Sequence, residues 1–195
     1  TCGEGLPIHI ALRAMLECET LDAARQIAHD GVCAPAHFLL ADGSGQAEGL
    51  EVHPGQPGTI TPARGVVTHT NHLVSDTATH WVEDFPKPDS WSRLSRLDAL
   101  VEQLLDDLGM DGSCADERGT ERGTASTAPN ESATLDAERL FDLLGDHTPG
   151  EDSLCRHFDP SVAEAERMET LFSVVMDLTD KVLWLRHGKP CQTTH

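Results

Sequence analysis

Apolar residues near the start of the chain recur every three to four positions, which is the spacing of one face of a helix. These residues are Ile8, Ala11, Leu12, Met15 and Leu16. Because Pro7 suits a first helical turn, the pattern predicts a helix over residues 7–19. Thr20 can cap a second helix over residues 21–29, whose apolar residues lie on one side. We therefore expect two helices that pack as an αα-hairpin.

The pattern then changes to short apolar runs separated by turn residues, which is typical of strands. Residues 36–42 and 46–52 predict a β-hairpin around the turn Gly43-Ser44-Gly45. Two further short strands, near residues 59–61 and 66–69, would extend the same antiparallel sheet. The first part of the chain therefore predicts two helices beside a small sheet.

The second part of the chain returns to helical spacing and ends in strands. Residues 72–88 are polar and irregular, and the prolines at their end stop any helix before the next element. Asp89 can cap a helix in which leucines recur at helical spacing, so we expect a helix over residues 89–108. A further helix is expected over residues 135–144, followed by a closing hairpin of strands 170–178 and 181–186.

A polar stretch of residues 109–133 separates the last two predicted helices. It consists mainly of Gly, Ser, Thr, Asp and Glu and has almost no apolar side chains. Such a segment cannot offset its ordering entropy by burying apolar surface. We therefore expect a mobile acidic insertion within one domain and not a domain boundary.

The composition excludes several kinds of partner. The chain carries a formal net charge of -19 with only 14 Lys and Arg residues, whereas nucleic-acid affinity depends on neutralising phosphates with basic side chains. We therefore expect no nucleic-acid partner and no membrane partner. The six cysteines show no CxxC spacing, which indicates neither a zinc ribbon nor a disulfide framework. No apolar run approaches the roughly 20 residues of a membrane span, so we expect a soluble, cytoplasmic protein with reduced thiols.

Two short polar clusters are the best candidates for chemistry. His69-Thr70-Asn71-His72 follows the apolar run Gly65-Val66-Val67, and a strand that ends in such a cluster can aim hydrogen-bond donors at one point. Ser153-Leu154-Cys155-Arg156-His157 lies far downstream, again before an apolar run. Together they suggest one active-site rim. Neither contains a nucleophile with its own base, so we expect the attacking group to lie elsewhere.

Five segments, read in order, resemble one family: the acyl-coenzyme A:6-aminopenicillanic acid acyltransferases, also described as C45 autoproteolytic acyltransferases and hydrolases. The resemblance covers nearly the whole chain, and the acidic insertion is its least matched part. The ordered set is more specific than any single tetrapeptide. The segments are Gly5-Leu6-Pro7-Ile8-His9-Ile10-Ala11-Leu12-Arg13, His69-Thr70-Asn71-His72, Asp89-Ser90-Trp91-Ser92-Arg93, Ser153-Leu154-Cys155-Arg156-His157 and Thr170-Leu171-Phe172-Ser173-Val174.

The resemblance implies an α+β fold, the four-layer αββα sandwich of the N-terminal-nucleophile hydrolases. In that superfamily a precursor cuts itself before a cysteine, whose thiol becomes the nucleophile. The freed α-amine acts as the base, which is reasonable for a group with a pKa near ~8. Neither Thr1 nor Cys2 sits at the matching position, so the resemblance places the nucleophile upstream of this chain. Residues 1–195 would then be the C-terminal portion of a single domain, inactive alone.

The same resemblance suggests roles for individual residues. Asn71 matches the oxyanion asparagine of the family; the alternative is a turn asparagine that satisfies its own backbone. We expect Arg156 to orient the nucleophile or to hold a substrate carboxylate; the alternative is a surface salt bridge. Arg167 aligns with an arginine of the penicillin-forming member. His69 and His72 are expected to position Asn71.

Metal binding is the main alternative for the histidines. His69 and His72 could be ligands, but no third ligand at a sensible spacing is evident, and catalytic zinc needs three. We therefore expect no metal and no cofactor. A small metal-binding protein that uses His69, His72, Cys155 and His157 is the competing interpretation.

The substrate is expected to be a small-molecule amide or acyl thioester. The penicillin-forming member carries serines where this chain has His53 and Glu166, so penicillin synthesis is not implied. Hydrolysis of an amide and acyl transfer to an amine both stay open. Glu51 could border the pocket or face water. A non-catalytic remnant that serves as a binding scaffold is a further alternative.

Overall fold

The computed structural model describes residues 5–53, 57–110, 135–148 and 153–192. The chain forms two compact units, Thr1–Trp91 with Asp177–Val182 and Ser92–Met176 with Leu183–His195, and each unit is considered by itself. The predicted insertion lies outside the described residues from residue 111 onward. No helix among the described residues is long and apolar enough to cross a membrane.

Two short helices begin the first unit, as the apolar spacing predicts. α1 spans Ile8–Leu16 and α2 spans Leu21–His29, and the Thr20 hydroxyl accepts a hydrogen bond from the Ala23 amide at 3.2 Å. The expected cap of α2 is therefore confirmed. α1 is shorter than predicted because Pro7 stands just before the helix, as its N-cap, and the helix ends at Leu16.

A three-stranded antiparallel sheet follows, in the order β1-β2-β3. Its strands are β1 (Ala36–Ala41), β2 (Ala47–Val52) and β3 (Gly58–Ile60). The fourth strand predicted over residues 66–69 is wrong. Arg64 and Gly65 adopt positive φ angles and make a tight turn, so that Val66 pairs only with Ala63. Beyond this pair, side chains rather than another strand hold the backbone.

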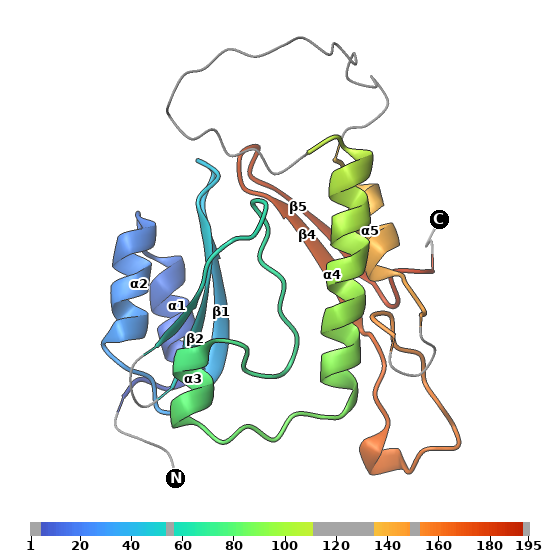
Figure 1. Cartoon of the computed structure of the whole chain (residues 1–195), viewed down its shortest axis with the longest axis horizontal. Helices are drawn as coiled ribbons and strands as arrows, with labels where there is room; N and C mark the ends of the chain where they lie inside the picture. Colours follow the sequence, from blue (N-terminus) through green and yellow to red (C-terminus); the bar gives the residue numbers. More distant parts are fainter. Residues whose placement is uncertain (1–4, 54–56, 111–134, 149–152, 193–195) are drawn as a thin grey trace. The chain divides into compact units, whose positions relative to one another are not determined.

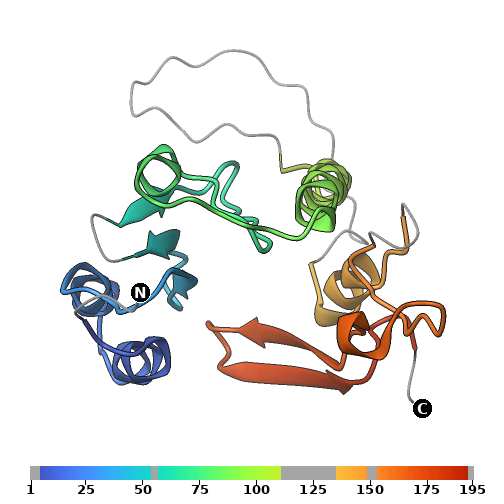
Figure 2. The same ribbon diagram turned by 90° about the horizontal axis from the view of Figure 1, so that it is seen from below.

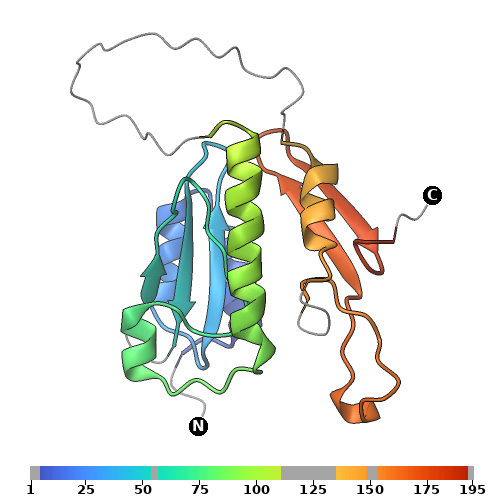
Figure 3. The same ribbon diagram turned by 45° about the vertical axis from the view of Figure 1, so that its right-hand side comes forward.

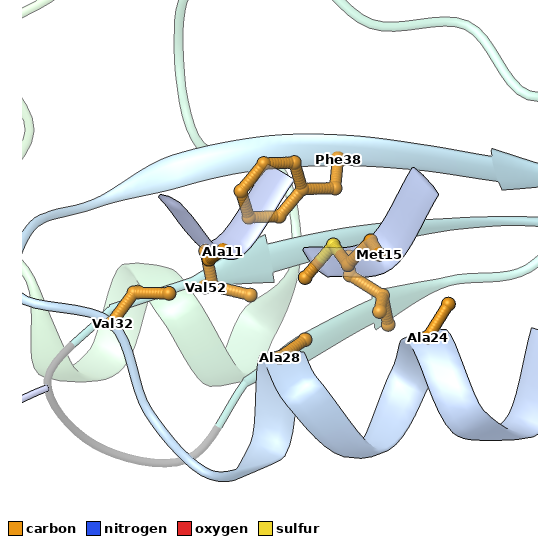
Figure 4. Close-up of a cluster of buried hydrophobic side chains, with 8 residues drawn as sticks. Ala11, Met15, Ala24, Ala28, Val32, Phe38 and Val52 are labelled. Carbon is orange, nitrogen blue, oxygen red and sulfur yellow. The ribbon is translucent and has the colours of Figure 1, made fainter. Parts of the chain in front are cut away.

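The core of the first unit lies between the helix pair and one face of β1 and β2 (Figures 1, 2 and 4). Paired strand residues share a face, and the register pairs Phe38 with Leu50. Both are buried on the face that α1 and α2 cover. The cluster consists of Ala11, Met15, Ala24, Ala28, Val32, Phe38, Leu50 and Val52. The register pairs His37 with Glu51 on the opposite face of the sheet.

A short helix, α3 (Asp76–Trp81), lies in the stretch predicted to be irregular. Ser75 caps it by accepting a hydrogen bond from the Ala78 amide at 3.3 Å, and Ala78 is fully buried. The apolar pattern could not reveal a helix of six residues that buries one alanine. α3 lies beside β3 (Figures 2 and 3).

The long helix α4 (Asp89–Asp107) starts at the end of the first unit and continues into the second. The second unit adds α5 (Ala137–Leu144), a 3₁₀ turn (Glu164–Glu166) and most of the hairpin β4–β5 (Phe172–Asp177, Val182–His187), whose residues 177–182 belong to the first unit. α5 lies against the hairpin (Figure 3). Arg186 of β5 places its guanidinium 4.2 Å from the centre of the Phe141 ring of α5.

The hairpin β4–β5 carries large apolar side chains that are exposed. Phe172, Met176, Leu183 and Leu185 each leave about 60% of their surface accessible (60%, 61%, 58% and 61%). The chain is thus a mixed α and β protein with small antiparallel sheets, which confirms the α+β class.

Candidate active site

Glu51 is the centre of a buried polar network in the first unit. It lies on the middle strand β2 and is fully buried. Its carboxylate accepts hydrogen bonds from His69 Nε2 at 2.8 Å, the Val74 amide at 2.7 Å, the Ser75 amide at 2.8 Å and the Ser75 hydroxyl at 2.6 Å. Burial raises the pKa of Glu51, but these four hydrogen bonds outweigh it and lower the pKa to about 2. The carboxylate is therefore ionised at neutral pH, and His69 Nε2 carries the donated proton.

A second imidazole completes this part of the network. His37 of β1 stacks on His69 with ring centroids 3.7 Å apart and an interplanar angle of 4°. Burial lowers the pKa of His37 to about 4; repulsion from His69 adds to this effect and Glu51 opposes it. A Cβ on Gly49 would lie 2.8 Å from His37 Nε2, and a Cβ on Gly58 would overlap the Ser75 hydroxyl. Two glycines in the sheet therefore make room for the network.

Ser90, fully buried in the first turn of α4, holds the other side of the same loop. Its hydroxyl accepts a hydrogen bond from the backbone N–H of Asn71 at 2.9 Å and lies 2.8 Å from His72 Nδ1. The Thr70 hydroxyl donates to the Ser90 carbonyl at 2.9 Å. The His72 ring packs on Trp91 with centroids 3.6 Å apart.

Residues 69–75 are therefore clamped from two sides, by Glu51 and by Ser90. His69 and His72 turn toward the buried partners, whereas Asn71 between them is exposed. Since the backbone of Asn71 is anchored, its side chain projects from a fixed position. Such an arrangement can present a hydrogen-bond donor without reorganisation when negative charge develops nearby.

Arg156, in the second unit, is half-buried and anchored through its backbone. Its amide donates to the Thr170 hydroxyl at 3.0 Å, and the Thr170 amide donates to its carbonyl at 3.0 Å. One guanidinium nitrogen lies 3.3 Å from the Met168 sulfur. Burial lowers the pKa of the guanidinium, although it stays charged at any physiological pH.

Arg167 uses its guanidinium within a loop of the second unit. It donates to the Val162 carbonyl at 2.7 Å and to the Pro160 carbonyl at 3.1 Å. Its charge also lies 4.9 Å from the centre of the Phe158 ring. These contacts favour a role in holding residues 158–167 together.

Cys155 and His157 meet two residues that the sequence did not connect with them. Cys155 Sγ lies 3.5 Å from Cys191 Sγ, and His157 Nε2 lies 3.0 Å from His147 Nε2. Burial raises the pKa of the Cys155 thiol to about 11, so by itself this thiol is protonated and a poor nucleophile at neutral pH. His69 and His72 of the alternative metal set are instead bonded to Glu51 and Ser90.

Comparison with known proteins places the sequence of this chain in a family. Residues 1–116 match the sequence model described as acyl-coenzyme A:6-aminopenicillanic acid acyl-transferase. The chain belongs to this acyltransferase family. The matched range includes the whole network around Glu51, Asn71 and Ser90, whereas Arg156 and Arg167 lie beyond it.

A curated relative extends the similarity along the chain. The chain is 28% identical, over 188 residues, to the acyl-coenzyme A:6-aminopenicillanic-acid-acyltransferase 40 kDa form of Emericella nidulans (strain FGSC A4). The alignment covers 95% of this chain and 44% of the relative. The chain therefore spans less than half the length of the acyltransferase that it matches.

In this member of the acyltransferase family, the sequence indicated the loop at residues 69–72 as a candidate site but did not indicate the residues that hold it. Ser90 belongs to a segment that carries the family resemblance, but nothing in the sequence indicates that its hydroxyl holds this loop. The strand pattern allows Glu51 either to border a pocket or to face water; instead it is fully buried and bonds to His69 and Ser75. His37 gave no signal, since a lone histidine in an apolar strand is usually a core residue. That Asn71 and Arg156 share one rim stays a prediction.

Proposed function

We propose that this chain is the C-terminal part of a cysteine N-terminal-nucleophile amidohydrolase or acyltransferase that acts on amide or thioester bonds. The nucleophilic cysteine and its α-amine base would be supplied by a part of the protein upstream of this chain. Membership of the acyltransferase family supports the reaction class. The observation that carries the proposal is the exposed Asn71 on a loop clamped by Glu51 and Ser90.

Asn71 is proposed to donate its side-chain amide to the oxyanion of the tetrahedral intermediate. An oxyanion donor is effective when the protein fixes it before the reaction. Here the loop is held by an ionised carboxylate on the central strand and by a buried hydroxyl at a helix start. His69 and His72 would act as positioning residues, because His69 bonds to Glu51 and His72 lies against the Ser90 hydroxyl.

Arg156 is proposed to orient the nucleophile or to bind a substrate carboxylate. Its half-buried guanidinium keeps its charge, and its backbone is fixed by Thr170. A planar guanidinium on a fixed backbone suits bidentate recognition of a carboxylate. Arg167 is proposed only as a support for the neighbouring loop.

Exposed apolar surface supports a larger αββα sandwich around the described elements. β1 has one strand neighbour among the described residues, and Leu39 on it is 57% exposed. A groove of about 540 Å³ runs between β1 and the helices α1 and α2. The apolar hairpin β4–β5 is likewise exposed. Strands from the upstream part would cover such surfaces, and the longer relative leaves room for them.

The proposed chemistry defines the bond that is attacked but not the rest of the substrate. A small-molecule amide or acyl thioester fits the proposed chemistry, and both hydrolysis and acyl transfer use the same acyl-enzyme intermediate. His53 stands at one of the positions where the penicillin-forming member carries serine, and it is 2% exposed. A buried imidazole there changes the polar groups near β2, so penicillin formation is not part of the proposal.

The test compares kinetics in the enzyme that joins this chain to its upstream part. Asn71→Ala should lower kcat on a model amide or thioester by roughly 10²- to 10³-fold, as loss of one oxyanion donor does. KM should change little, because the lost hydrogen bond belongs mainly to the transition state. The matched control is Asn130→Ala, at the only other asparagine of the chain, and it should keep full activity.

Thermal melts decide between catalysis and structure. The Asn71→Ala enzyme should melt within a few degrees of the unchanged enzyme, since the exposed side chain contributes little packing. Full kcat in this variant would overturn the oxyanion assignment. Turnover by the 195-residue chain alone, after alkylation of all its thiols, would overturn the proposal of an upstream cysteine.

A further inference from the structure

Four potential metal ligands converge in the second unit. His147, Cys155, His157 and Cys191 each offer one ligand atom, and these four atoms all lie within 4.8 Å of one another. They come from the loop after α5, from the segment before Arg156 and after it, and from the end of the described chain beyond β5. Four of the distances are 3.0 Å between the imidazole nitrogens, 3.5 Å between the sulfurs, and 3.3 and 3.7 Å from His157 to Cys191 and Cys155.

These distances have the size of the edges of a zinc tetrahedron. Zinc binds thiolate at about 2.3 Å and imidazole at about 2.0–2.1 Å. The edge of a tetrahedron is about 1.63 times its centre-to-corner length, so the edges should be about 3.8 Å for two sulfurs, about 3.4 Å for two nitrogens and about 3.6 Å for a mixed pair. Each of the four distances lies within about 0.4 Å of its expected edge.

We propose that His147, Cys155, His157 and Cys191 bind one Zn²⁺ ion in a closed tetrahedral site. Two thiolates and two imidazoles are the ligand set of structural zinc sites, and soft thiolates favour zinc over Mg²⁺ or Ca²⁺. On binding, each thiol gives its proton to solvent and each sulfur donates an electron pair to the ion. The site has a fourth protein ligand instead of an open position, so its role is structural.

Hydrogen bonds alone account for this cluster less well than a cation does. A single proton can join the two imidazole nitrogens, but the same His157 nitrogen also lies within 3.3 Å of Cys191 Sγ and 3.7 Å of Cys155 Sγ. Thiols are weak donors. One cation at the centre would satisfy all four lone pairs at once.

The backbone around the cluster is built to bring these segments together. The Cys155 amide donates to the Asp146 carbonyl at 3.1 Å, which joins the two segments that carry His147 and Cys155. The last segment passes beside Gly145, where a Cβ would lie 3.4 Å from the Cys191 Cα, about van der Waals contact. None of the four ligands lies in a helix or strand, so a metal would connect segments that lack a ladder of backbone hydrogen bonds.

A zinc ion would also fix the backbone on both sides of Arg156, which stands between two ligands. The proposal does not depend on any catalytic role of Arg156, because metal content is measured without turnover. The proposed zinc site contradicts the sequence-based expectation of no metal. That expectation rested on the spacing of ligands along the sequence, whereas these four residues come together only in the folded chain. The main competitor is a disulfide between Cys155 and Cys191, whose sulfurs are 3.5 Å apart and would have to approach to about 2.05 Å.

The experiment measures zinc in the purified 195-residue chain by plasma mass spectrometry, with thiols kept reduced and counted. One zinc per chain is expected. Cys155→Ser and Cys191→Ser should each remove stoichiometric zinc, whereas the matched controls Cys18→Ser and Cys33→Ser, at free thiols of the first unit, should retain it. His147→Asn should raise the Kd for zinc at least about 100-fold, since loss of a second-shell partner alone costs 10- to 100-fold.

Cobalt spectroscopy keeps the test decisive if a variant fails to fold. The unchanged chain loaded with Co²⁺ should show a thiolate-to-cobalt charge-transfer band and the intense visible bands of tetrahedral cobalt, and zinc should displace both. A fully reduced chain that binds neither metal would overturn the proposal. So would a Cys191→Ser chain that keeps its zinc, or a Cys155–Cys191 disulfide in chains that show no zinc binding after reduction.

Discussion

The two polar clusters of this protein are built on opposite principles. Around Glu51, each short distance joins a donor to an acceptor: one imidazole, two backbone amides and one hydroxyl all point at a single carboxylate. Around His157, the short distances join two imidazoles and two sulfurs, which are all electron-pair donors to a metal. The first cluster is complete within the protein, whereas the second would be completed by a cation.

This difference separates two ways of holding a loop. The Glu51 carboxylate fixes residues 69–75 only as long as it stays ionised and its partners donate hydrogen bonds to it. A zinc site would fix its segments as long as the thiolates stay reduced and metal is present. The chain thus has one cluster that responds to pH and, by our proposal, one that responds to metal and oxidation.

The largest effect is expected from Glu51→Ala. It leaves the donors of His69, Val74 and Ser75 buried without their acceptor, and breaking a buried charged network by removing one partner costs roughly 3–5 kcal/mol. The measurement is urea denaturation followed by circular dichroism. Glu17→Ala, which removes an exposed ion pair with Arg13, should cost less than about 1 kcal/mol.

Glu51→Ala also tests whether the two clusters are independent. If the proposed zinc site belongs to the second unit alone, a folded Glu51→Ala chain should still bind one zinc. A loss below about 1 kcal/mol would show that the network is not the support of the loop. Loss of zinc together with stability would break the comparison between the two clusters.

A smaller effect is expected from pH, through His37. The unfolded chain binds a proton on this imidazole below about pH 6.5, whereas the folded chain, whose His37 pKa is about 4, does not until the pH falls further. Because the unfolded state binds more protons in this window, stability should fall by roughly 2–3 kcal/mol between pH 6.5 and pH 4. Below about pH 4.5, the lowered pKa of Glu51 adds a second loss that continues to about pH 2.

His37→Gln should flatten the upper part of this profile. The control is His29→Gln at the exposed end of α2, which should leave the pH dependence unchanged. The free energy of unfolding is measured at several pH values between 7 and 4. An unchanged slope in His37→Gln would assign the acid sensitivity to other groups.

Contiguous patterns made part of this structure predictable. Helical spacing predicted α1, α2, α4 and α5, because in each of them apolar residues recur every three to four positions. The sequence indicated residues 69–72 as a candidate site because their polar side chains are adjacent. The path of residues 66–75 could not be predicted, because hydrogen bonds to the buried side chains of Glu51 and Ser90, and not pairing with another strand, hold this stretch.

The supports of the two clusters were out of reach for a different reason. Glu51 and Ser90 act on a loop about twenty residues away from each, and nothing in the local pattern of a strand or helix reports such a contact. His147 and Cys191 are 44 positions apart (191 minus 147), far beyond the spacing by which short zinc motifs are found. Only the folded chain brings them together.

The smallest effect is expected from Ser90→Ala, which removes the second attachment of the loop. The backbone N–H of Asn71 loses its acceptor and His72 Nδ1 loses its neighbour, but the Thr70 hydroxyl still donates to the backbone carbonyl of residue 90. The cost should therefore be roughly 1–2 kcal/mol, smaller than for Glu51→Ala. Ser95→Ala, on an exposed position of the same helix, is the matched control and should change stability by less than about 0.5 kcal/mol.

Kinetics sharpen what this hydroxyl does. In the proposed enzyme that joins this chain to an upstream part, Ser90→Ala should lower kcat less than Asn71→Ala does. The proposed oxyanion donor, the Asn71 side chain, stays present in this variant, and only its backbone is loosened. KM should again change little. If Ser90→Ala lowered stability but left kcat untouched, the Glu51 side of the clamp would be sufficient to fix Asn71. If Ser90→Ala lowered kcat as much as Asn71→Ala does, the position of the Asn71 side chain would depend on the start of α4 and not on the sheet.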